Sequence, residues 1–478
     1  MIGTSAWKYG VLAAACAGLL AACGDDFVPE EARPQDARVF TVADPNATTF
    51  APMAAAAGDV VNMSTTSRWA GVLGGAAYLI EVPANWNGQL VMYAHGYRGT
   101  GKTLTVDPPS IRRHLIQQGY AWAASSYSAN YYDVRAGVED TNALALAFTR
   151  IAAANGRPLS NPAKRFIIGH SMGGHISAAA VEAETLFYAV NPVRYNGAVP
   201  MCGVVGDTEL FNEFAAMQVT AQALAGVPDV PTTQWPTIKD QVTSALFTAF
   251  PSVPTARGLQ YLSVVMNLTG GPRPMFDLGI AIGGSFPAAY GTFGGDGTID
   301  GILNHSVLDT TAYTYTISGD AAASAALNAS AQKLRAVPDA NRLRSDGLRW
   351  IPQVNGDIRV PVVSIHTLGD LFVPFSMEQT YARRTAAQGT GNWLVQRAIR
   401  GVSHCDFTVA EQVEAFDAMT AWEAGGARPG GDDVLTAATV AAPTYGCTYT
   451  RNDVSGPDES PTTKALRPAA VANSARCP

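Results

Sequence analysis

The sequence has few charged residues and no run of basic ones. Of its 478 residues only 15% are charged, and 32 Lys plus Arg are outnumbered by 39 Asp plus Glu, which gives a formal net charge of −7 at pH 7. A mildly acidic chain with no basic run offers no face that neutralises phosphates, so we expect no nucleic-acid partner. Because 47% of the residues are hydrophobic, the composition also excludes a mainly disordered chain.

Long apolar runs and internal repeats are missing as well. The apolar stretch Val11–Leu20, behind Lys8, is long enough for the centre of a signal peptide and too short for a membrane-spanning helix. No repeat of solenoid length is found. At roughly 100–200 residues per domain, the length allows two to four domains, or one large domain with an insertion.

Cys23 follows this apolar stretch in a pattern that resembles a bacterial lipoprotein signal. The small residues of Leu20-Ala21-Ala22 would fit a signal-peptidase pocket, and the Cys23 thiol would receive a diacylglycerol. Gly24, directly after Cys23, resembles the residue at that position in lipoprotein signals that direct a protein to an outer membrane. We therefore expect a lipid anchor and a location in the cell envelope, at the bacterial outer membrane or facing the periplasm or the outside. A secretory signal with an incidental cysteine is the alternative.

Strand-like and helix-like segments alternate over residues 67–205 and 360–424. Short apolar runs predict strands, helical spacing predicts helices between them, and Pro83–Gly88 has the composition of a hairpin turn. This alternation indicates an α/β fold with a mostly parallel, twisted sheet flanked by helices. Residues 206–359 interrupt it with apolar helical stretches and a Gly-rich section, which predicts one large, mainly helical inserted cap.

Both ends of the chain differ from this core. Residues 1–22 are the expected signal peptide, and residues 23–66, rich in Pro, Ala, Asp and Thr, are the expected lipidated tether and leading segment. Residues 425–478 form a Gly/Pro/Thr-rich tail with little apolar surface, which we expect a disulfide to hold in place.

The strongest chemical signal is Gly169-His170-Ser171-Met172-Gly173, which matches G-x-S-x-G. It follows an apolar strand and precedes a helix of small residues, the setting in which a tight turn lifts a serine hydroxyl above the sheet edge. We predict that Ser171 is a nucleophile. The alternative is a Gly-rich connection without a chemical role.

A serine nucleophile needs a base and an orienting acid. His404 follows the last strand, at the C-terminal edge of the sheet, and is the predicted base. His170 and His175 lie too close to Ser171 in the chain to reach its hydroxyl productively.

The predicted acid is Asp370, because it follows the strand at 361–366 and so lies at the same sheet edge. Asp406 is too near His404 in the sequence. Asp207, at the end of the strand after the nucleophile helix, is the remaining rival, and any single Asp could instead be a helix cap.

An oxyanion needs two hydrogen-bond donors. The backbone N–H of Met172, next to Ser171, is one expected donor. The other is the N–H of Tyr97, since Gly96 allows the backbone to bend toward a substrate, and His95 is expected to brace this loop.

Two further segments have weaker signals. Tyr127, Tyr131 and Tyr132 could line an acyl pocket or serve packing alone. Asp296–Gly301 resembles a calcium loop only faintly, since it lacks the middle acidic positions and the closing Glu, so we interpret it as a turn-rich loop of the cap.

In the chain order Ser171, Asp370, His404, with His95-Gly96 ahead of them, the sequence resembles the α/β-hydrolase superfamily. The resemblance implies ester or amide hydrolysis on a twisted, mainly parallel sheet. The neighbouring pair His404-Cys405 is also similar to the tannase and feruloyl-esterase group, although His170 stands where that group has a cysteine.

The function that follows is a secreted, membrane-anchored serine hydrolase that cleaves small or polymeric carboxylic esters without a cofactor. A peptidase of the same fold and an inactive binding lipoprotein are the alternatives. The oligomeric state is unknown.

Four cysteines stay in the mature chain, and an even number in an oxidising compartment indicates two disulfides. Their spacing matches no zinc site and no CxxC occurs, so no metal is expected. Cys405 must reach the active sheet edge with His404, where Cys202 also ends, which favours Cys202–Cys405. That leaves Cys447–Cys477 within the tail, although four cysteines allow three pairings.

Overall fold

The computed structural model describes residues 32–43, 50–473 and 477. Arg33–Pro478 form one compact unit. The expected signal peptide and Cys23 lie outside the described residues. Within the described part of the chain, no helix is both long and apolar enough to cross a membrane.

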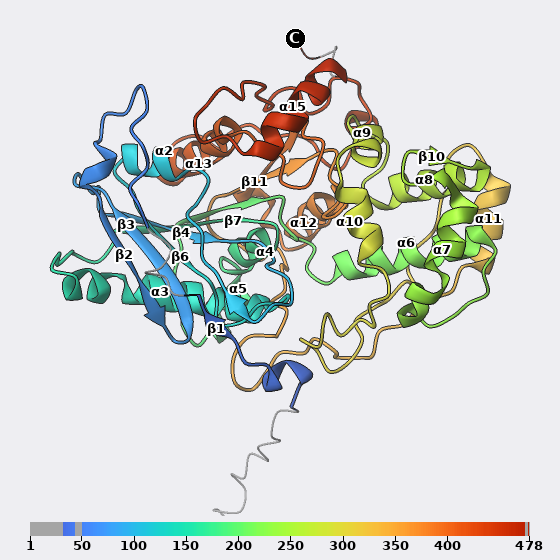
Figure 1. Cartoon of the computed structure of the whole chain (residues 1–478), viewed down its shortest axis with the longest axis horizontal. Helices are drawn as coiled ribbons and strands as arrows, with labels where there is room; N and C mark the ends of the chain where they lie inside the picture. The colour runs from blue at the N-terminus through green and yellow to red at the C-terminus, as the bar shows by residue number, and fades with distance from the viewer. Residues whose placement is uncertain (1–31, 44–49, 474–476, 478) are drawn as a thin grey trace, which may run out of the picture. The chain divides into compact units, whose positions relative to one another are not determined.

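One mixed sheet forms the centre of this unit (Figure 1). Its eight strands are β2 (Ser67–Leu73), β3 (Ala76–Val82), β4 (Gln89–Ala94), β6 (Ala121–Ser125), β7 (Lys164–His170), β8 (Gly197–Met201), β11 (Val362–Thr367) and β12 (Leu394–Ile399). They lie in the order β12-β11-β8-β7-β4-β6-β3-β2. The pairs β2–β3 and β3–β6 are antiparallel and all other neighbours are parallel, as the alternation of strands and helices predicts.

Helices cover both faces because the central strands are apolar on both sides. In β4, Leu90 and Met92 join one hydrophobic cluster, whereas Val91 and Tyr93 point to the other face and join a second. The first cluster is covered by α3 (Val134–Ala154), α4 (Met172–Ala179) and α12 (Ser376–Ala387). The second is covered by α2 (Arg112–Gln117) and α13 (Val409–Glu423). A short helix, α5 (Ala183–Tyr188), follows α4.

The expected hairpin at Pro83–Gly88 is wrong. Strand β6 lies between β3 and β4 and pairs with both. β4 is buried on both faces and needs a partner along each edge, which β6 and β7 supply in parallel register. The connection from β3 therefore crosses past β6 instead of turning back.

The regular structure of the segment between β8 and β11 is mainly helical, and irregular chain makes up the rest of the segment. It contains α6 (Glu209–Ala225), α7 (Trp235–Leu246), α8 (Ala256–Leu268), α9 (Phe276–Ala281), α10 (Ser285–Gly291), α11 (Ala321–Ser330), the 3-10 turn η3 (Thr232–Gln234) and the small ladder β9 (Phe247–Ala249) with β10 (Val253–Pro254). Figure 1 shows these helices grouped to one side of the sheet. The fold is thus a helix-flanked α/β sheet with one helical insert.

The segment before the sheet lies along the same unit. After the 3-10 turn η1 (Pro34–Ala37), β1 (Thr41–Val42) pairs in parallel with β5 (Thr103–Leu104), and a second such turn, η2 (Met63–Thr65), leads into β2. A third, η4 (Gly391–Trp393), precedes β12.

The tail packs more firmly than its composition suggested. It holds α14 (Ala437–Val440) and α15 (Pro461–Asn473). Val440 and Tyr445 are buried in a cluster with Leu368 of the core. Arg467 of α15 is also buried, and its guanidinium donates to the Glu411 carboxylate at 2.7 Å. Apolar contacts and a buried ion pair therefore fix this segment in addition to a disulfide.

Candidate active site

Ser171 lies in a tight turn between β7 and α4. Its backbone has φ 57° and ψ −121°, a conformation that L-residues rarely adopt. The two glycines of the motif make the turn possible: an added Cβ would come within 2.1 Å of the Gly173 carbonyl oxygen at Gly169, and within 2.0 Å of the Ala94 carbonyl oxygen at Gly173. The turn leaves the serine hydroxyl at the N-terminus of α4.

Three predicted side chains form one chain of hydrogen bonds. His404 Nε2 lies 2.8 Å from Ser171 Oγ, and His404 Nδ1 lies 2.5 Å from Asp370 Oδ2. With Nδ1 donating to the carboxylate, Nε2 is left as an acceptor for the serine proton. The geometry is that of a nucleophile, a base and an orienting acid.

The Asp370 carboxylate is fully buried at the end of β11. Its other oxygen accepts hydrogen bonds from the backbone N–H groups of Phe372 (2.9 Å) and Val373 (3.0 Å). These donors fix the carboxylate plane toward His404.

The rival acid Asp207 points elsewhere. Its Oδ2 accepts from the guanidinium of Arg384 at 2.6 Å and from the Val354 N–H at 3.0 Å. Asp406 is also committed, since its Oδ2 accepts from the Val402 N–H at 2.9 Å within the His404 loop.

The other histidines near the motif are bound to other groups. His170 Nε2 lies 3.0 Å from Gln412 Oε1, and burial lowers the pKa of His170 to about 4. His175 Nε2 donates to the Pro352 carbonyl at 2.7 Å. His95 stacks on Tyr127, and burial lowers the pKa of His95 to about 4, so this side chain braces its loop as a neutral ring.

The two expected oxyanion donors lie beside Ser171. A Cβ added at Gly96 would be 3.2 Å from Ser171 Cβ, so the loop that carries Tyr97 runs against the nucleophile. Among the described residues, neither the Tyr97 N–H nor the Met172 N–H makes a hydrogen bond. Both donors are therefore available for an oxyanion.

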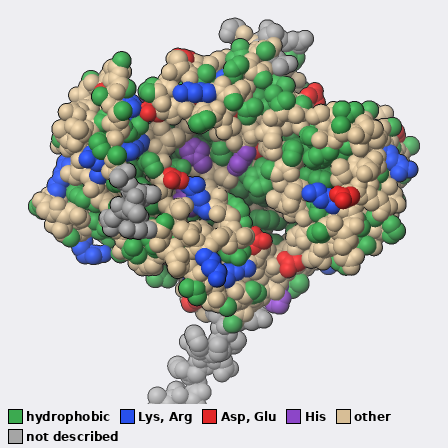
Figure 2. Space-filling model, in the orientation of Figure 1, with side chains coloured by type: hydrophobic (Ala, Val, Ile, Leu, Met, Phe, Trp, Pro, Cys, Tyr) green, Lys and Arg blue, Asp and Glu red, His purple; other side chains and the backbone are tan. Residues whose placement is uncertain are grey.

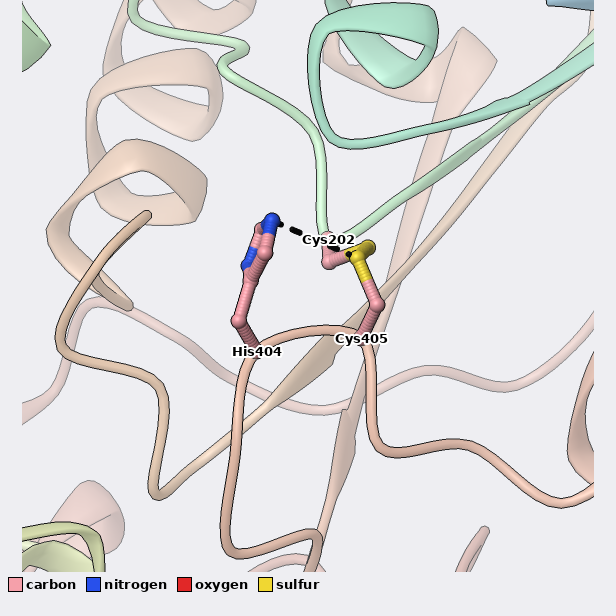
Figure 3. Close-up of side chains that lie close together, drawn as sticks. All are labelled: Cys202, His404 and Cys405. Atoms are coloured by element: carbon pink, nitrogen blue, oxygen red, sulfur yellow. Dashed lines mark hydrogen bonds between the residues drawn. A yellow bond between two sulfur atoms is a disulfide. The ribbon is translucent and has the colours of Figure 1, made fainter. Parts of the chain in front are cut away.

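A disulfide joins Cys202, just past β8, to Cys405, the neighbour of His404 (Figure 3). Cys405 Sγ lies 3.4 Å from His404 Nε2. Among the described residues, one group of possible metal ligands lies close together: Cys202, His404 and Cys405. Both of its sulfur atoms are engaged in the disulfide. The bond therefore fixes the histidine loop to the sheet. The second disulfide pairs Cys447 with Cys477, so both pairings are as predicted.

A cavity of about 590 Å³ opens beside Ser171. Its walls are mostly apolar and come from the core and the insert, including Tyr131, Tyr132, Phe214 and Phe372. Figure 2 shows this face hollowed, with hydrophobic side chains in the hollow. Tyr127 is instead buried in the core, where its hydroxyl donates to the His95 carbonyl.

Parts of the cavity wall were not predicted. Pro34 and Arg38, from the segment interpreted as a tether, line it. Arg38 stacks on Tyr131 at 3.5 Å from the ring centroid and donates to the Asp300 carbonyl at 2.6 Å. The sequence did hold a signal for this role, because the segment, otherwise rich in Pro and Ala, contains aromatic and basic residues. The loop Asp296–Gly301 forms turns, as interpreted, and belongs to the same wall.

Comparisons with known proteins give distant likenesses, and no family model matches. A 66-residue segment is 32% identical to an o-phthalyl amidase of Xanthobacter agilis, covering 14% of this chain and 15% of that protein's length. Feruloyl esterase B from Aspergillus oryzae aligns over 76% of this chain and 81% of its own, at 17% identity and a TM-score of 0.43. An esterase from the same organism aligns over 76% and 80%, at 11% identity and a TM-score of 0.42. By its own sheet order, serine turn and order of serine, acid and histidine, the chain has an α/β-hydrolase fold.

Proposed function

We propose that this chain is a serine hydrolase that cleaves carboxylic esters through an acyl-enzyme. The observation that carries the proposal is the chain of hydrogen bonds Ser171–His404–Asp370 at an apolar cavity. An oriented triad with a buried acid and open space beside the serine suits attack on an acyl carbon.

The reaction has two halves, acylation of Ser171 and hydrolysis of the acyl-enzyme, and His404, Asp370 and the oxyanion donors act in both. His404 Nε2 takes the Ser171 proton as Oγ attacks the acyl carbon, and the N–H groups of Tyr97 and Met172 hold the oxyanion. His404 then gives the proton to the leaving alcohol, and Asp370 stabilises the imidazolium while it exists. Water, deprotonated by His404, repeats the cycle on the acyl-enzyme and releases the acid.

The cavity favours substrates with a bulky apolar acyl or alcohol group, because most of its wall is aromatic or aliphatic. Amide cleavage is a second candidate, since the curated relative with 32% identity over 66 residues is named an amidase. Both reactions share the acyl-enzyme and differ in the leaving group.

A fluorophosphonate probe and paired substrates test the proposal. The probe should label the native chain at Ser171, and absence of labelling would show an inactive scaffold. A set of 4-nitrophenyl esters of increasing acyl size, measured beside the matching nitroanilides, separates esterase from amidase. We expect faster turnover of the esters, and faster turnover of the nitroanilides would overturn the ester assignment.

We also propose that Cys23 carries a lipid that anchors the enzyme in the cell envelope. The support is the sequence Leu20-Ala21-Ala22-Cys23 behind an apolar stretch.

A further inference from the structure

Arg273, in the insert between α8 and α9, is a buried cation with unusual partners. Its Nε donates to the Leu368 carbonyl at 2.8 Å, and its terminal nitrogens reach the Gly271 carbonyl at 3.0 Å and Thr269 Oγ1 at 3.3 Å. Among the described residues it forms no ion pair, and it is 7% exposed. A buried charge without a paired carboxylate is costly, so a second contribution must offset it.

Glu213 and Asp370 both act on Arg273 electrostatically, but neither forms an ion pair with it among the described residues. Burial raises the pKa of Glu213 to about 8, so at neutral pH this side chain is mostly protonated. Burial lowers the pKa of Arg273 to about 10, and the Asp370 carboxyl group acts in the opposite direction. Arg273 thus stays charged at neutral pH and lies against the Leu368 carbonyl, two residues before Asp370 in the chain.

The other titratable side chains near Asp370 are two histidines, and one of them is paired with Glu378. Asp370 Oδ2 lies 2.5 Å from His404 Nδ1 and 3.9 Å from His366 Nε2. Burial alone would lower the pKa of His366, but Glu378, together with Asp370 and the Val373 carbonyl, outweighs this and raises it. Glu378 lies 3.4 Å from His366 Nδ1, so these two form a pair of their own.

The insert also contacts both catalytic loops through its backbone. A Cβ added at Gly279 would be 2.2 Å from the Gly369 carbonyl oxygen, and one at Gly283 would be 2.3 Å from the Val402 carbonyl oxygen. Ser285 Oγ accepts from the Leu371 N–H at 3.1 Å and lies 3.3 Å from the Gly369 carbonyl. The insert therefore packs against the loop that carries Asp370 and also lines part of the cavity beside Ser171.

We infer that Arg273 is a positioning residue for Asp370: it holds the loop that carries Asp370 through the Leu368 carbonyl and keeps a positive charge beside that loop. The inference rests on the proposed function, in which Asp370 orients His404.

The test follows the rate of fluorophosphonate labelling of Ser171 against pH. Removing a positive charge from beside this loop favours protonation of both Asp370 and His404 in the variant. Either protonation slows labelling, so the acid limb of the profile, over which the rate falls as the pH falls, moves to higher pH. In Arg273→Gln we expect this limb to move up by about 0.5 pH unit or more, which slows labelling below its midpoint roughly threefold or more. Arg273→Lys keeps the charge and should leave the limb in place, with a slower maximal rate because the Leu368 contact is disturbed.

Two variants serve as controls. Arg157→Gln removes a guanidinium that donates to the Val82 and Pro83 carbonyls, outside the site, and should not move the limb. Ser285→Ala removes an uncharged contact of the acid loop and should slow labelling without moving the limb.

An unmoved limb in a folded Arg273→Gln, or equal movement in the Lys and Gln variants, would overturn the inference. If Arg273→Gln does not fold, an upward shift in Arg273→Lys would overturn it instead. A native chain that the probe does not label at all would refute the proposed function, which is a different result.

Discussion

At the scale of the residue, the site depends on a few backbone positions that only certain side chains allow. Ser171 holds a left-handed φ of 57°, and Gly173 approaches the Ala94 carbonyl so closely that a methyl group cannot fit. This strain places the hydroxyl where His404 reaches it. Because the strained turn lies between a buried strand and a helix, the surrounding packing can sustain it.

Ser171→Ala should abolish hydrolysis, because the hydroxyl is the bond-forming atom. We expect a loss on the order of 10⁴-fold or more, measured as kcat/KM on the best ester. Circular dichroism and thermal melting should show a folded protein. Near-normal turnover in that folded variant would remove Ser171 from the mechanism.

Asp370→Asn should also cost activity, because an amide favours the wrong tautomer of His404. Asp207→Asn is the matched variant: it changes a buried Asp that binds Arg384 and lies outside the triad. We expect Asp207→Asn to lower the melting temperature and to leave most of the turnover per folded molecule. The reverse ranking of the two variants in kcat would assign the acid to β8.

At the scale of the element, the His404 loop is held from several directions. Thr367 Oγ1 donates to the Ser403 carbonyl at 2.8 Å, and the disulfide ties Cys405 to the end of β8. Cys202 and Cys405 both have a positive φ, at 45° and 56°. The loop is thus fixed by its neighbours and has little local preference for its own shape.

The two disulfides should therefore have different effects. Cys202→Ser with Cys405→Ser should lower kcat, because the loop that carries His404 loses its tie to the sheet. Cys447→Ser with Cys477→Ser, which opens a loop of sequence separation 30, should leave kcat unchanged and lower the melting temperature. In the chain-entropy model the lost stability is roughly 3–4 kcal/mol. Equal kcat in the two double variants would contradict this division.

The elements also show what sequence patterns can and cannot predict. β4 and β7 were predictable because apolar runs are local, and Ser171 was predictable because its motif needs a strand before it and a helix after it. The false hairpin at Pro83–Gly88 arose because strand order depends on partners distant in the sequence. Arg273 gave no signal, since its role exists only once the insert packs on the loop of Asp370.

At the scale of the whole molecule, the site is assembled from three separate parts of the chain. The core supplies the three residues of the proposed triad, the insert supplies much of the cavity wall, and the segment at 33–42 closes another part of that wall. Arg33 joins that segment to the insert by donating to the Ile302 carbonyl at 2.9 Å. Loss of any part should therefore change the catalytic site.

Cys23→Ala should prevent lipid attachment and shift the protein from the membrane to the soluble fraction, or leave it unprocessed. Fractionation after metabolic labelling with a fatty acid measures both outcomes. Ser171→Ala is the control, because it should stay lipidated and membrane-bound. Normal membrane partition of Cys23→Ala would show that the signal has been misinterpreted.

The contact of Pro34 and Arg38 with the cavity has a practical consequence for protein production. A shortened chain for crystallisation, designed from the predicted boundary, would begin near residue 67 and would still contain the full sheet and triad. It would nevertheless lack two residues that line the cavity beside Ser171, and the strand pair β1–β5. Its substrate preference would describe an opened pocket, so kinetic work needs a chain that begins before Arg33.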